Sequence, residues 1–133
     1  MLKTPSQIEG DFYRIARGSA LGQTIRGDVY RNGMRPDNAT GEDAVVAFLA
    51  GNDTNPQTGV VVLRIYVPDI LFRGRKVKDI ARFEELEGKV WEMIRAYRGE
   101  YYFKTEVSMT HAMHEEIGQH CLIARLEFQR ITD

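Results

Sequence analysis

Two nearly continuous apolar runs, residues 45–49 and 60–63, constrain the fold of this chain more than any other feature of its sequence. Each run lies in a segment rich in β-branched residues and bounded by turn residues, which predicts strands over residues 42–50 and 58–67. The polar segment 51–58 is expected to join them as an antiparallel hairpin. Because apolar and polar residues do not alternate along the runs, both strands are expected to be central and covered on both faces.

Local capping signals predict two helices outside this hairpin. Thr4 is placed as an N-cap with Gln7 three residues later, which is the spacing of a capping box. The helix of residues 5–17 is expected to end with Gly18 in the left-handed conformation. Asp79 is the expected N-cap of the only long helix, which ends near Gly99. The apolar residues of this second helix recur at the spacing of an amphipathic helix packed on a sheet: Ile80, Phe83, Leu86, Val90, Ile94 and Tyr97.

The remaining segments are predicted as strands and one long loop. Residues 24–31 are expected to form a strand interrupted at Gly27 by a bulge or a close backbone approach. Residues 32–43 contain two Gly, two Asn, two Asp and one Pro, a composition typical of a loop. The last third is predicted as a hairpin with its turn at residues 116–119, in a register that sets Met109 opposite Leu126 and His114 opposite Cys121.

The order of elements predicts a single α+β domain over residues 1–133. We expect a mostly antiparallel sheet of about five strands, with an N-terminal helix and one long amphipathic helix packed on it. The net charge of -1 argues against a protein that mainly wraps nucleic acid or lies on an anionic membrane. The single Cys121 cannot form an intramolecular disulfide, and no apolar run is long enough to span a bilayer. A soluble domain in a reducing compartment is the expectation.

Residue types that carry chemistry are present but are not expected to converge. His111 and His114 have the spacing of two metal ligands on a helix, but on a strand positions three apart point to opposite faces. A nucleophilic Cys121 would need an electropositive setting, which an exposed strand end does not supply. Neither a Walker motif nor a dinucleotide-binding glycine motif occurs. We therefore predict no catalytic, cofactor or metal site, and not an enzyme.

Two features of the sequence are typical of surfaces that bind a partner. One is the cationic run of Arg73, Arg75, Lys76, Lys78 and Arg82, which suits DNA phosphate, an acidic protein surface, or simply a solvated connection. The other is the pair of long polar loops, residues 32–43 and 51–58, because loops of this length carry binding contacts or tolerate insertions.

Several strings within this order of elements carry a resemblance to a known family. They are residues 25–30 (IRGDVY), 35–38 (RPDN), 42–46 (EDAVV), 60–69 ending in VPD, and 126–131 (LEFQRI), together with the single long helix. With them the chain resembles the tail-completion, or tail-terminator, proteins of long-tailed bacteriophages and prophages, which act in head-tail joining.

The resemblance implies a structural role in virion assembly. Such proteins form an oligomeric ring, typically hexameric, that ends the tail tube and joins it to the head. The implied partners are further copies of the chain, the tail-tube protein and the head-tail connector protein, without a membrane and with only incidental DNA contact. The implied location is the virion and, during assembly, the host cytoplasm. Exposed loops suit the contacts of a ring, so the candidate partner contacts are Met34, Arg35, Asp37, Asn38, Arg73, Arg75, Lys76 and Lys78.

Two other hypotheses stay open at this point. One is a small α+β ligand-binding domain or enzyme of unknown substrate, with His111, His114, Cys121 and Tyr102 near one end of the sheet. The other is DNA binding through residues 73–78, which the near-neutral net charge makes the less favoured of the two.

Overall fold

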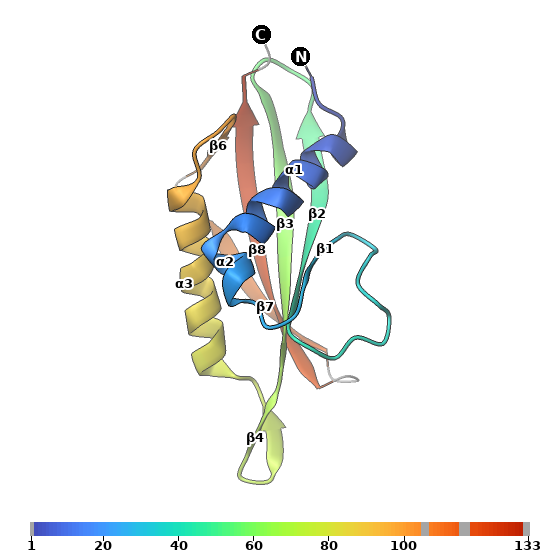
Figure 1. Cartoon of the computed structure of the whole chain (residues 1–133), viewed down its shortest axis with the longest axis vertical. Helices are drawn as coiled ribbons and strands as arrows, with labels where there is room; N and C mark the ends of the chain where they lie inside the picture. Colours follow the sequence, from blue (N-terminus) through green and yellow to red (C-terminus); the bar gives the residue numbers. More distant parts are fainter. Residues whose placement is uncertain (1, 105–106, 115–117, 132–133) are drawn as a thin grey trace.

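The computed structural model describes residues 2–104, 107–114 and 118–131, which form a twisted sheet with helices on one face (Figure 1). This arrangement confirms the predicted α+β class and the mostly antiparallel sheet. The sheet has six strands rather than about five, and a separate two-stranded hairpin extends beyond it. One extra strand is β6 (Tyr101–Phe103), whose three residues are too few to give a periodic signal.

The N-terminal helix α1 (Pro5–Gly18) begins at the predicted capping box. The Gln7 amide donates to the Thr4 hydroxyl (3.2 Å), and the Thr4 amide donates to the Gln7 side chain (2.9 Å). The prediction for its end is wrong, because Gly18 does not adopt a positive φ. Instead Ser19 caps both the end of α1 and the start of a second short helix, α2 (Ala20–Thr24).

The predicted strand of residues 24–31 is wrong over its first half, because α2 occupies residue 24 and β1 begins only at Val29. The expected close approach at Gly27 is confirmed. Its amide donates to the carbonyl of Glu42 (2.9 Å), and a Cβ at this position would lie 2.2 Å from Oδ1 of Asp43. The absence of a side chain therefore lets the segment before β1 lie against the start of β2.

The strand order of the main sheet is β1-β2-β3-β8-β6, and β7 pairs with the first half of β8. Only β1 and β2 are parallel, and the other pairs are antiparallel. A register shift after Phe48 marks a bulge in β2. The bounds are β1 (Val29–Arg31), β2 (Asp43–Asn52), β3 (Gln57–Pro68), β7 (Ser108–His114) and β8 (Gln119–Arg130).

The hydrophobic core lies between the helices and one face of this sheet. Alternate strand residues such as Leu63, Ile65 and Leu122 pack there with Phe12 of α1 and Phe83 of the long helix α3 (Ile80–Ala96). The central strands were expected to be covered on both faces, and this is wrong as far as helices are concerned. Figure 1 shows the helices on one face of the sheet only. On the other face Val45 and Val62 are nevertheless buried. Their cross-strand neighbours are Arg64 and Arg125, and the long aliphatic stems of arginines suit the cover of smaller residues beside them.

The closing hairpin confirms the predicted faces but not the predicted register. Met109 lies opposite Ala124 rather than Leu126, a shift of two residues that keeps each side chain on its face because the strand period is two. Cys121 consequently lies opposite Ala112, and His114 lies opposite Gln119. Residues 115–117 of the expected turn, and the side chain of His114, lie outside the described part of the chain.

The long helix α3 (Ile80–Ala96) begins at the predicted N-cap, where the Asp79 side chain accepts from the Arg82 amide (3.2 Å). Phe83, Leu86 and Val90 of the predicted stripe are buried against the sheet. Ile80, the first residue of α3, is an exception and is 60% exposed.

Candidate functional site

The structure shows a projecting hairpin that the sequence analysis did not predict. It is formed by β4 (Ile70–Phe72) and β5 (Arg75–Val77). Arg73 and Gly74 make its two-residue turn, and both have positive φ (49° and 81°), as a type I′ turn requires. In Figure 1 the hairpin extends from the end of the sheet, below the start of α3. Three residues of the cationic run, Arg73, Arg75 and Lys76, therefore lie on a small hairpin, which the sequence analysis did not predict.

The hairpin exposes large apolar side chains that a solvated connection would not need. Ile70, Leu71 and Phe72 are 43%, 74% and 51% exposed. Partners in the register Ile70–Val77, Leu71–Lys76 and Phe72–Arg75 share a face, because residues opposite each other on paired strands point the same way. Ile70, Phe72 and Arg75 thus lie on one face of the hairpin, and Leu71 and Lys76 lie on the other.

The cationic residues singled out in the sequence divide into three environments. Arg73, Arg75 and Lys76 are exposed on the hairpin, and the Arg73 guanidinium lies 5.2 Å from the ring centre of Phe72. Lys78 lies at the hairpin base, where it donates to Nδ1 of His111 (3.1 Å). Arg82 is buried in an ion pair with Glu42 and does not belong to the surface at all.

The base of the hairpin is tied to the closing strands. The Asp69 amide donates to the carbonyl of Gly118 (2.9 Å), and the Asp69 carboxylate lies 2.6 Å from Nδ1 of His120. Lys78 can only donate, so Nδ1 of His111 accepts, and Nε2 of His111 donates to Glu87 (2.8 Å). These contacts fix the direction in which the hairpin leaves the body.

The second set of predicted contacts, in the loop of residues 32–42, is only partly available to a partner. The Arg35 side chain is largely enclosed by its own chain: it donates to Asp43 (3.0 Å) and to the carbonyl of Gly41 (3.1 Å), and its guanidinium lies 4.1 Å from the ring centre of Tyr66. Met34 is exposed, as are Asp37 and Asn38. The loop protrudes from the β1 side of the sheet and the hairpin from its end, so the two predicted sets form separate surfaces (Figure 1).

A hollow of about 470 Å³ lies on the outer surface between α3 and β7. Its apolar lining includes Trp91, which is 48% exposed, and its acidic lining includes Glu84. No sequence pattern singles out Trp91, because it lies outside the apolar stripe of α3 among charged residues. The full lining is Glu84, Glu87, Gly88, Trp91, Val107 and Met109.

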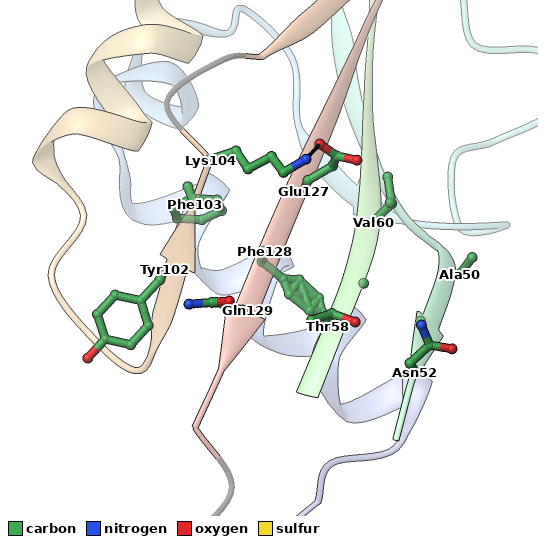
Figure 2. Close-up of a pocket in the computed structure, with 12 residues that line it drawn as sticks. Ala50, Asn52, Thr58, Val60, Tyr102, Phe103, Lys104, Glu127, Phe128 and Gln129 are labelled. Atoms are coloured by element: carbon green, nitrogen blue, oxygen red, sulfur yellow. Dashed lines mark ion pairs between the residues drawn. The ribbon is translucent and has the colours of Figure 1, made fainter. Parts of the chain in front are cut away.

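A larger hollow, of about 610 Å³, lies on the sheet face that carries no helix, near the ends of β2, β3, β8 and β6 (Figure 2). Small side chains such as Ala50, Thr58 and Val60 form part of its lining. Lys104 and Glu127 form an ion pair there (3.0 Å), but both side chains are largely exposed, so water screens their attraction. No group in this lining is placed to act on another as acid, base or nucleophile.

The residues proposed for a ligand or enzyme site do not come together. Tyr102 pairs with Gln129 and Cys121 lies eight positions back along β8, a separation of roughly 26 Å at the strand rise. Cys121 and His111 point to opposite faces of the sheet, since His111 lies opposite Leu122. Burial raises the pKa of the Cys121 thiol to about 11, which keeps it protonated at neutral pH.

Over residues 2–104, 107–114 and 118–131, no group of three or more His, Cys, Asp or Glu is placed to hold a metal ion. Within the same residues, no helix is both long and apolar enough to cross a membrane. Compared with protein-family models and with curated proteins, the chain matches none of them.

Proposed function

We propose that this protein is a structural assembly subunit that works by joining copies of itself to other proteins. The observation that carries the proposal is the β4–β5 hairpin, which holds three exposed apolar side chains away from the body of the molecule. Exposed apolar groups of this size are costly in water unless a partner covers them. Three cations beside them add a means of selecting an acidic partner.

Within this class, we propose the role of a tail terminator in a bacteriophage or prophage. The strings at residues 25–30, 35–38, 42–46, 60–69 and 126–131 support this role through their resemblance to tail-completion proteins. In the proposed role a ring of the protein ends the tail tube and offers its other side to the head-tail connector, in the virion and before that in the host cytoplasm. The exposed residues Met34, Asp37 and Asn38 are a second proposed contact surface.

The test is electron microscopy of the protein mixed with the tail-tube protein encoded in the same genome. We expect rings on the ends of tubes, and shorter tubes than in the absence of the protein. The variant Leu71→Ser/Phe72→Ser should lose this effect, and Leu2→Ser, which changes an exposed leucine on the N-terminal segment, should keep it. Tubes that grow to the same length and without caps in the presence of wild-type protein would refute the proposed role.

A further inference from the structure

We infer that the β4–β5 hairpin of one copy docks into the hollow between α3 and β7 of the next copy. The inference rests on the proposed function as an assembly subunit and names the contact through which copies join. It makes the hairpin and the hollow the two halves of one interface, head to tail.

The hairpin supplies a face with both apolar and cationic groups. Ile70 and Phe72 lie on the same side as Arg75, and Arg73 reaches the Phe72 ring from the turn. The opposite side carries Leu71 and Lys76, and Lys76 extends toward Gly118 of its own chain. Both faces are exposed, and the face with Ile70, Phe72 and Arg75 is the one that carries two apolar side chains beside an arginine.

The hollow supplies the complementary groups. Trp91, Val107 and Met109 offer apolar surface for Ile70 and Phe72, and Glu84 and Glu87 offer carboxylates for the arginines. Among the residues that the structure describes, Glu84 has no ion-pair partner of its own, whereas Glu87 is paired with His111. An arginine brought to Glu84 would thus gain a new ion pair without breaking one.

The contact has to form between copies rather than within one chain. In Figure 1 the hairpin leaves the start of α3 in the direction opposite to that in which α3 runs, so its tip lies away from the hollow. Because the two surfaces differ, the contact is heterologous, and each copy has a free hairpin and a free hollow for further copies. Such contacts produce a closed ring when the rotation between copies closes.

The size of the hairpin sets the strength of a single contact. Each strand has three residues, so the hairpin is about 10 Å long. It cannot by itself bury the roughly 1,200 Å² of total surface typical of a stable pair. A single contact is therefore expected to be weak, and closure of a ring, which makes the last contact intramolecular, is expected to stabilise the assembly.

A disulfide trap tests the contact even when it is weak. Mixing Phe72→Cys protein with Gly88→Cys protein under mild oxidation should give the mixed disulfide, because a bridge forms only when the two Cα atoms approach within about 7 Å. Gly88 has space for the new side chain, and the native Cys121 is buried. Leu71→Cys mixed with Gly88→Cys is the matched control, with a more exposed position on the opposite face of the same hairpin. Equal yields from the two mixtures overturn the inference.

A charge exchange provides an independent readout. Arg75→Glu and Glu84→Arg should each weaken self-association by about tenfold in sedimentation experiments, and an equimolar mixture should recover it, because each altered surface then meets an opposite charge. A mixture that associates no better than the separate variants overturns the inference. Capped tubes without the 72–88 disulfide would refute this contact and leave the proposed function standing. The disulfide without capped tubes would refute the tail role and leave the contact standing.

Discussion

Arg82 is expected to be the most costly charged residue to remove, because it holds three elements together in a buried place. Its guanidinium donates to both carboxylate oxygens of Glu42 (2.8 and 2.6 Å) and to the carbonyl of Thr24 (2.8 Å). The exposed fractions of the Arg82 and Glu42 side chains are 9% and 2%. These bonds connect α3 to the end of α2 and to the start of β2.

The substitution Arg82→Met keeps most of the side-chain volume and leaves the Glu42 carboxylate buried with the Arg26 amide as its remaining donor (3.2 Å). Breaking a buried pair in this way costs about 3–5 kcal/mol. A domain of this size has only about 5–15 kcal/mol of stability to lose. The expected fall in melting temperature is roughly 10–20 °C.

Urea unfolding followed by circular dichroism measures this loss. Arg14→Met is the matched control, because Arg14 is 67% exposed and its ion pair with Asp11 should contribute about 1 kcal/mol or less. The double variant Arg82→Met/Glu42→Met should recover most of the stability, since it removes both charges together. The reasoning is refuted if Arg82→Met unfolds within about 1 kcal/mol of the wild type, or if the double variant is no more stable than the single one.

Two further predictions concern a glycine and acid stability. Gly27→Ala should destabilise the protein by about 1–3 kcal/mol, because the new Cβ would lie within 2.4 Å of backbone and carboxylate atoms. Gly41→Ala is the control and should not destabilise it, because there is open space around Gly41. Equal melting temperatures of the two variants would contradict this prediction. A hydrogen bond from Lys3 lowers the pKa of Glu100. Burial raises the pKa of Asp11, but hydrogen bonds, of which the one from Lys3 has the largest effect, outweigh burial and lower this pKa overall. Both carboxylates therefore add stability that is complete above their ordinary pKa values of 4.5 and 3.8 and is lost as the pH falls through the lower folded-state values. Asp11→Asn/Glu100→Gln should flatten the dependence of stability on pH between about pH 5 and 2, and an unchanged slope would contradict this.

The parts of the fold that the sequence predicts correctly are those with a local cause. The capping residues Thr4 and Asp79 determine where the two main helices begin, and the bonds that do so span only three residues. The strands β2 and β3 follow from long apolar runs. By contrast, α2 has only five residues, and its N-cap Ser19 is also the C-cap of α1, so neither a periodic pattern nor a separate cap indicates it.

The register of the closing hairpin shows a different limit. The period of two decides which side chains face the helices, and Met109 and His111 lie on the predicted face. The same pattern is satisfied by registers two residues apart, so it does not choose between Ala124 and Leu126 as the partner of Met109.

The candidate site was predicted by residue type and not by environment. Arg35, Arg75 and Arg82 look alike in the sequence, and only Arg75 is exposed. Arg82 pairs with Glu85 at the local i,i+3 spacing, but its buried partner Glu42 is 40 positions away along the chain, a separation that no local pattern reveals. The turn at Arg73 and Gly74, between an apolar triplet and Val77, was the available signal for the hairpin.

The hairpin also affects which parts of the sequence can diverge in evolution. Its strands pair with each other and not with the main sheet, and the core contains none of its residues. Residues 70–77 are therefore free to vary, lengthen or shorten with little effect on folding. In the proposed assembly role, the choice of partner could therefore change through residues 70–77 while the stability of the domain stays the same.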